Sequence, residues 1–160
     1  MATKLLTIGR EAVALDGISA RVDLDPKEFA EDVKRLQDFA NVTIREKLKA
    51  TGMGKAYLQN LGRRLFEAVF QGEVLEHYRK LLDSQSPFRL ALHIEDYELV
   101  SLPWEFLYDF RHELFLGASG NTNLCRRLPG VEPGILTPVA APLLQALLVF
   151  SAHDVSLVFG

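Results

Sequence analysis

Alternating apolar and polar positions near the start of the chain predict a β-hairpin. The alternation covers Ala12 to Leu15 and resumes from Ile18 to Leu24. Asp16-Gly17 stands between the two runs, and this dipeptide tolerates the positive φ angles of a two-residue type I′ turn. The first structural element that the pattern predicts is therefore a pair of short antiparallel strands.

Helical periodicity dominates the next part of the chain. Asp25 supplies a capping oxygen, Pro26 suits the first helical position, and Glu28 stands at N3, so a helix is predicted to begin at Pro26. Gly62, inside a stripe of apolar positions, leaves room for another backbone to approach. Helices are expected over Pro26 to Phe39, Asn41 to Ala50 and Lys55 to Phe70, and, after an interruption at Gln71-Gly72, from Val74 to near Asp83.

Strand patterns return from Phe88. Phe88 to Ile94 alternates like a strand with one buried face. A short helical turn is predicted to begin at Pro103. Two further strands are predicted over Glu113 to Gly117 and Thr122 to Leu128, and we expect them to pair as a hairpin.

The last part of the chain combines a connector with one very apolar segment. Pro129 to Pro142 holds four prolines and two glycines and reads as an extended connector. Leu143 to Phe150 is nearly continuous in apolar residues, which is typical of a strand buried on both faces of a parallel sheet. We place a domain boundary at residue 54: residues 1–54 hold the hairpin and helices, and residues 55–160 form an α/β domain.

Composition narrows the function classes. The 160 residues are 48% hydrophobic and 24% charged, enough for a packed core, and the formal net charge of -3 disfavours nucleic acid and anionic membrane as partners. The apolar run near Leu5 is too short for a signal peptide, and Leu143 to Phe150 falls far below the roughly 20 residues that span a bilayer. We therefore expect a cytoplasmic protein.

Cysteine usage adds a further constraint. Cys125 is the single cysteine, so the chain has no internal disulfide, which fits a reducing compartment. No pair of histidines has metal-ligand spacing. We expect no metal and no cofactor.

Five segments in the later part of the chain together resemble the CHAT family of caspase-like domains. They are Leu61-Gly62-Arg63-Arg64-Leu65-Phe66, Arg89-Leu90-Ala91-Leu92, Leu102-Pro103-Trp104-Glu105-Phe106-Leu107-Tyr108-Asp109, Phe115-Leu116-Gly117 with Arg126, and Leu144-Gln145-Ala146-Leu147-Leu148-Val149. The resemblance covers roughly the last hundred residues. It implies a mixed sheet flanked by helices, and hence an α/β chain with an N-terminal hairpin, a helical middle and the front part of a caspase-like core.

The resemblance also implies a His-Cys dyad, which this sequence does not supply. The family's histidine lies in a motif similar to H-x-x-G-H-G, and its cysteine follows a later strand; neither segment occurs here. No catalytic residue carries over. We expect the non-catalytic N-terminal part of a CHAT-type peptidase or bacterial signalling protein, which braces a catalytic core. The alternative is a stand-alone protein-interaction module with a degenerate CHAT fold.

The predicted site residues are structural rather than catalytic: Pro103, Trp104, Glu105 and Arg126. Trp104 is expected in the core, because a buried indole fills a large volume. Arg126 matches the family's arginine, and we expect it to hold Glu105 in a bidentate contact. If that pair is buried, removing one partner alone is expected to cost about 3–5 kcal/mol.

Other reactive side chains have simpler interpretations. Cys125 lies on a predicted strand and is expected to pack as a small hydrophobe, since no base or electropositive setting accompanies it. His153 follows an apolar strand, a place where ligands gather in open α/β sheets, yet position alone favours an exposed loop histidine. An enzyme acting through these two residues is the third alternative. His77, His93 and His112 are expected at the surface or as caps.

The apolar strand also suggests how the chain meets partners. Leu143 to Phe150 calls for neighbours on both edges, and the segments that would supply them are missing from the sequence. We expect self-association or binding of a protein partner through this strand, or its coverage by Ser151 to Gly160.

Overall fold

The computed structural model describes residues 1–41 and 54–127, and all of them belong to the first of two compact units, Met1–Pro129 and Gly130–Gly160. Several predicted features lie outside the described residues. They are the helix after Asn41, the proline-rich connector, the strand from Leu143 to Phe150, and His153.

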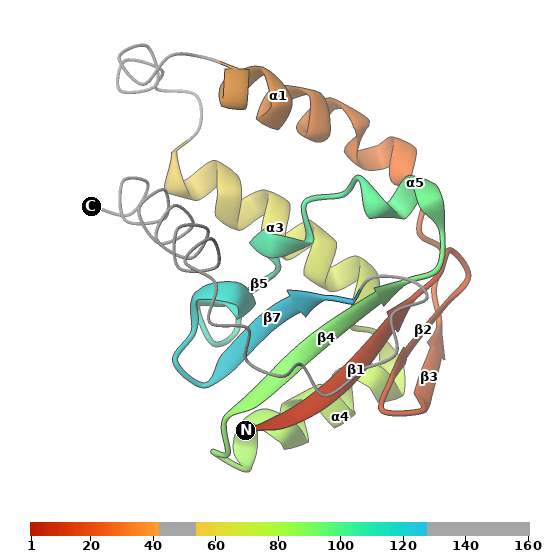
Figure 1. Ribbon diagram of the computed structural model, residues 1–160, viewed down its shortest axis with the longest axis vertical. Helices are drawn as coiled ribbons and strands as arrows, with labels where there is room; N and C mark the ends of the chain where they lie inside the picture. The colour runs from red at the N-terminus through yellow and green to blue at the C-terminus, as the bar shows by residue number, and fades with distance from the viewer. Residues whose placement is uncertain (42–53, 128–160) are drawn as a thin grey trace, which may run out of the picture. The chain divides into compact units, whose positions relative to one another are not determined.

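The described strands form two sheets (Figure 1). The larger is mixed and has five strands in the order β3-β2-β1-β4-β7, in which β1, β4 and β7 pair in parallel, while β2 pairs antiparallel with both of its neighbours, β1 and β3. A small second sheet pairs β5 with β6. The bounds are β1 (Ala2–Ile8), β2 (Ala12–Leu15), β3 (Ile18–Arg21), β4 (Phe88–Ile94), β5 (Tyr108–Asp109), β6 (Leu114–Phe115) and β7 (Thr122–Arg126).

Helices connect and cover these strands. They are the 3-10 turn η1 (Pro26–Phe29), α1 (Ala30–Asn41), α3 (Lys55–Val69), α4 (Gly72–Asp83), α5 (Tyr97–Val100), and the 3-10 turns η2 (Trp104–Phe106) and η3 (Leu116–Ala118). α4 packs against β2 and β3, and α3 packs against β5 and η2. The predicted α/β class with a mixed sheet is confirmed.

The hairpin turn agrees with the prediction in detail. Asp16 and Gly17 have φ angles of 51° and 85°, the left-handed conformations that a type I′ turn requires, and Leu15 pairs with Ile18 across it. The Asp16 side chain adds contacts that the sequence did not predict. It accepts a hydrogen bond from the Leu5 amide at 3.0 Å and pairs with the Lys4 ammonium at 2.8 Å. The turn is thereby fastened to β1.

Strand β1 itself was not predicted from the sequence. Leu6 and Ile8 are fully buried, and β1 pairs with β2 on one side and β4 on the other. It is flanked by strands on both edges, so its short apolar pattern is that of an internal strand. β1 and β4 stand on opposite sides of residue 54, where we placed a boundary, and they share one sheet.

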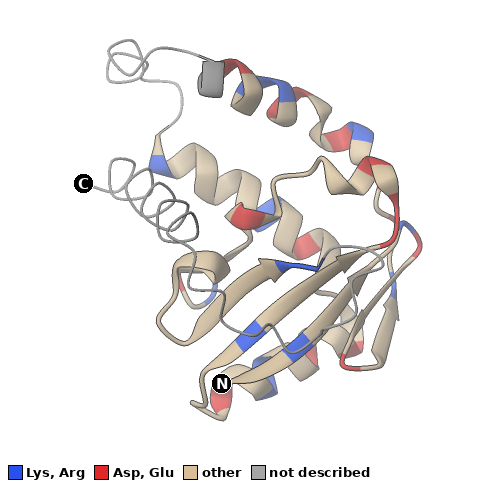
Figure 2. Cartoon of the chain, viewed as in Figure 1, with Lys and Arg blue, Asp and Glu red and all other residues tan. Residues whose placement is uncertain are grey.

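The predicted helix starts are confirmed. The Asp25 carboxylate accepts a hydrogen bond from the Lys27 amide at 2.9 Å, and η1 begins at Pro26 before the chain continues as α1. Acidic and basic side chains are interspersed along α1, which gives it a mixed polar face (Figure 2). α3 and α4 follow at the expected positions, and β4 spans the predicted strand.

The predicted hairpin of Glu113 to Gly117 with Thr122 to Leu128 is wrong. Leu114–Phe115 pairs instead with Tyr108–Asp109, and Thr122–Arg126 pairs in parallel with β4. Thr122 Oγ1 donates to the Leu116 carbonyl at 2.8 Å, so the two segments are in contact without pairing as strands. The parallel register places Leu124 beside Leu90 of the core. Burial against β4 therefore decides the strand's partner, and alternation alone could not.

Candidate functional site

The predicted structural residues meet around the short turn η2. Trp104 has no exposed surface, and its Nε1–H donates to the Leu99 carbonyl at 2.8 Å, so the indole is both buried and hydrogen-bonded. Pro103 precedes η2 as its N-terminal cap residue. The expectation that Trp104 belongs to the core is confirmed.

Helix α3 approaches this turn at Gly62. A Cβ atom placed on Gly62 would lie 1.9 Å from the carbonyl oxygen of Phe106 and 2.8 Å from the Cβ of Tyr108. No side chain fits into that space. The close backbone approach that the sequence predicted at Gly62 is confirmed, and it fixes α3 against the segment that follows Trp104.

Glu105 and Arg126 form the predicted bidentate contact. Arg126 Nε lies 2.6 Å from Glu105 Oε1, and Nη2 lies 2.9 Å from Oε2. The same guanidinium donates to the carbonyls of Val100 at 2.6 Å and Leu102 at 2.9 Å. Arg126 therefore ties the end of β7 to the whole segment between α5 and η2.

This pair is only partly buried. The Glu105 side chain is 57% exposed and that of Arg126 is 32% exposed. Water screens the attraction and also solvates a carboxylate left without its partner. The cost expected for a buried pair therefore does not apply, and the backbone contacts of Arg126 matter more than its charge.

The remaining sequence candidates are scattered. Cys125 is a free, half-buried thiol on β7. His112 is exposed, as predicted, whereas His77 and His93 are half-buried, with Nε2 and Nδ1 lacking a hydrogen bond. Among the described residues, no group of three or more His, Cys, Asp or Glu side chains could hold a metal ion.

Asp109 is a buried carboxylate that the sequence analysis did not single out. It is 3% exposed, lies 2.7 Å from His112 Nδ1, and accepts hydrogen bonds from the amides of Arg111 and His112 at 3.0 and 3.3 Å. The buried Tyr78 hydroxyl makes no well-formed hydrogen bond. Burial, together with the nearby Asp109 carboxylate, raises the pKa of Tyr78.

The Asp109–His112 pair resembles the Asp and His members of a Ser-His-Asp catalytic triad, but no nucleophile accompanies it among the described residues. No Ser, Thr or Cys of the described residues makes a hydrogen bond to the His112 ring. The sequence pattern D-x-x-H could have predicted this pair, because an aspartate in a turn commonly accepts hydrogen bonds from the amides that follow it. We assign the pair to holding the tip of the β5–β6 hairpin.

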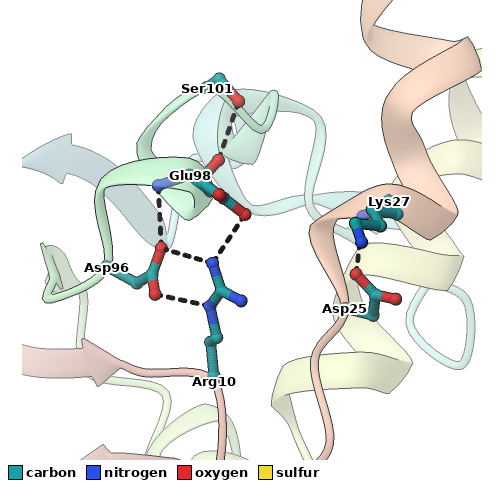
Figure 3. A network of polar contacts seen from close by, with 6 residues as sticks. All are labelled: Arg10, Asp25, Lys27, Asp96, Glu98 and Ser101. Carbon is teal, nitrogen blue, oxygen red and sulfur yellow. Dashed lines mark hydrogen bonds and ion pairs between the residues drawn. The ribbon is translucent and has the colours of Figure 1, made fainter.

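A second arginine network joins the β1–β2 loop to α5 (Figure 3). Arg10 Nε lies 2.6 Å from Asp96 Oδ2, and Nη2 lies 2.6 Å from Glu98 Oε2. Its hydrogen bond to Asp96 raises the pKa of Arg10 and lowers that of the Asp96 carboxyl. Because the partners stand far apart in the sequence, no local pattern predicted this contact.

Beside this network runs an open apolar groove of about 470 Å³, which we call the α1–α5 groove. Its apolar lining comes from η1 and α1 on one wall and from the α5 segment on the other: Pro26, Ala30, Val33, Tyr97, Val100 and Leu102. The sequence analysis did not predict this groove, because its two walls come from segments that are far apart in the sequence.

The chain matches no protein-family model, no curated protein and no solved structure. Within the described ranges, no helix combines the length and hydrophobicity needed to cross a bilayer.

Proposed function

We propose that this chain is the non-catalytic N-terminal part of a CHAT-type, caspase-like peptidase or signalling protein, and that it braces a catalytic core. One observation carries the proposal. Three of the five segments on which the resemblance rests are far apart in the sequence, yet they meet at the turn η2. Gly62 abuts Phe106, and Arg126 holds Glu105. The Leu116 amide donates to the Leu107 carbonyl at 2.9 Å.

The bracing role follows from where Arg126 lies. It is the last residue of β7, and its guanidinium is held by Glu105 and by two backbone carbonyls. The end of β7, which pairs with β4, is thereby fixed in position and direction. A core that continues from this point would start from a rigid support.

The absence of a family dyad from this sequence gives the proposal a direct test. Neither an H-x-x-G-H-G-like segment nor its downstream cysteine occurs among these residues. The experiment is to read the genomic frame and the neighbouring genes for such a motif, and then to express that segment with and without this chain. We expect soluble, active core only in the presence of this chain, and less with an Arg126→Ala variant. A core that folds and cleaves equally well alone would refute the bracing role.

A second candidate is a stand-alone protein-interaction module with a degenerate CHAT fold. The α1–α5 groove favours it, because Tyr97 is 91% exposed and Val100 is 42% exposed beside a hollow. Absence of any core segment from the frame and its neighbours would favour this alternative. In either case we expect the purified chain alone to cleave no peptide. The Cys125→Ser and His153→Ala variants are the controls, and cleavage that disappears in both of them would overturn this expectation.

A further inference from the structure

His112 is the exposed member of the hydrogen-bonded pair at the tip of the β5–β6 hairpin. Its Nδ1 lies 2.7 Å from Asp109 Oδ2, and its side chain is 34% exposed, whereas Asp109 is buried. A carboxylate can only accept hydrogen bonds, so Nδ1 is the donor. In the neutral ring the lone pair therefore stands on Nε2, which makes no hydrogen bond to a described residue.

The Asp109 carboxylate is itself held in one orientation. Its Oδ1 accepts hydrogen bonds from the amides of Arg111 and His112 at 3.0 and 3.3 Å. The fully buried Tyr78 hydroxyl lies near it from α4, and burial together with this carboxylate raises the pKa of Tyr78. The Asp109 backbone belongs to β5 and pairs with Leu114 of β6. A carboxylate fixed in this way sets the orientation and the tautomer of the imidazole that it binds.

The other described histidines have a different environment. His77 and His93 are half-buried, and Nε2 of His77 and Nδ1 of His93 are buried without a hydrogen bond. The Asp16 carboxylate lies 3.8 Å from His77 Nε2 and is already paired with the Lys4 ammonium at 2.8 Å. Among the described residues, His112 is therefore the histidine that combines an exposed ring with a tautomer fixed by a hydrogen-bonded carboxylate.

This arrangement makes the His112 ring a nucleophile. Histidine side chains form covalent intermediates by attack through an unprotonated ring nitrogen. When Nε2 forms a new bond, the ring becomes positively charged, and a carboxylate that is hydrogen-bonded to Nδ1 stabilises that charge. Asp109 thus acts twice: it fixes the lone pair on Nε2 before the attack, and it balances the positive charge of the product.

We propose that His112 accepts a phosphoryl group on Nε2 from a phosphoramidate, a donor whose phosphorus is bonded to nitrogen. The Nε2 lone pair forms the new N–P bond, the N–P bond of the donor breaks, and the amine, already protonated in the donor, leaves with the electron pair. The Nδ1 proton stays on the ring, shared with Asp109. Because one N–P bond replaces another, the transfer requires an open ring nitrogen rather than a deep pocket. The inference does not depend on the bracing role, since His112 takes no part in the Glu105–Arg126 contact.

The test uses the full chain and potassium phosphoramidate at neutral pH. Mass spectrometry of proteolytic fragments identifies the modified histidine, and phosphorus NMR shows which ring nitrogen carries the group. We expect modification of His112 at Nε2, faster than that of His77 and His93. His112 should also react about threefold or more faster than the same histidine in a blocked peptide of residues 108–115, which has the sequence without the fold. A pair that only holds the hairpin tip would give no gain over the peptide.

Matched variants separate the fixed lone pair from general charge effects. In Asp109→Asn, an amide nitrogen donates to Nδ1 in place of Oδ2, so the ring proton moves to Nε2 and the rate should fall by about tenfold or more. Glu113→Gln removes a charge from an exposed position on the same turn and should change the rate by no more than about twofold. The comparison with the peptide decides the matter even if Asp109→Asn does not fold. Attack at Nδ1, a rate equal to that of the peptide, or an Asp109→Asn variant that folds and reacts like the parent would overturn the proposal.

Discussion

Gly62 of α3 lies against the carbonyl oxygen of Phe106, so closely that an added Cβ would stand 1.9 Å from it. The obstructing atom is backbone, which cannot swing aside as a flexible side chain would. Gly62→Ala is therefore expected to destabilise the protein by about 1–3 kcal/mol or more, although alanine is the better helix former.

Chemical denaturation measures this change, and Gly120→Ala is the matched control. A Cβ at Gly120 meets nothing within 4 Å, and its φ lies outside the left-handed region. The control should be close to neutral. If Gly62→Ala were as stable as the control, the contact between α3 and η2 would not exist as described.

Trp104 is the single tryptophan of the chain, and it is fully buried. Trp104→Ala is expected to lower the free energy of unfolding by about 3–5 kcal/mol, because it empties a large buried volume. In the parent chain the fluorescence should be blue-shifted and move to the red on unfolding. Tyr97→Ala, at an exposed aromatic, should leave the melting temperature nearly unchanged. An emission maximum of free tryptophan in the native chain would place the indole in water.

Arg126 and Glu105 should contribute unequally to stability. Glu105→Ala removes a half-exposed charge pair and is expected to cost less than about 1 kcal/mol. Arg126→Ala also removes the guanidinium that donates to the Val100 carbonyl and leaves the Leu102 carbonyl with the Trp104 amide alone, so about 1–3 kcal/mol is expected. The double-mutant cycle should give a coupling below about 1 kcal/mol. A larger loss for Glu105→Ala than for Arg126→Ala would contradict this account of the contacts.

The carboxylate of Asp16 should make stability depend on acid pH. Burial by itself raises the pKa of Asp16, but hydrogen bonds from Lys4 and the Leu5 amide outweigh it, and the net pKa is lowered. A lowered pKa in the folded state means that the contribution is complete above the unfolded-state pKa of about 4 and is lost as pH falls through the folded-state value.

Asp16→Asn isolates this charge, because Asn-Gly forms the same type I′ turn. At pH 7 the variant should be less stable by under about 1 kcal/mol, since Asp16 is partly exposed. The difference in unfolding free energy between the two proteins should shrink as the pH falls below about 4. A difference that stays constant down to pH 2 would mean that the carboxylate does not pair with Lys4.

Local patterns were sufficient for the parts of the fold that local physics decides. The turn at Asp16-Gly17 follows from the backbone freedom of two residues, the start at Pro26 from the Asp25 cap just before it, and α3 from apolar spacing within one helix. Even the contact between Glu105 and Arg126 was accessible, but only through the resemblance to a family and not through spacing.

Tertiary structure decided which strands pair and which surfaces meet. From the sequence β1 is only a short apolar stretch, and the structure shows it flanked by β2 and β4. The sequence allows β7 to form a hairpin, and the structure pairs it with β4, where Leu124 packs partly buried against the core. The network of Arg10 with Asp96 and the α1–α5 groove join segments that no sequence window contains. The energy of the hydrogen bonds along a strand edge, or of an ion pair, is nearly the same for many possible partners. Burial of the core therefore decides which strands pair, and that core exists only in the folded chain.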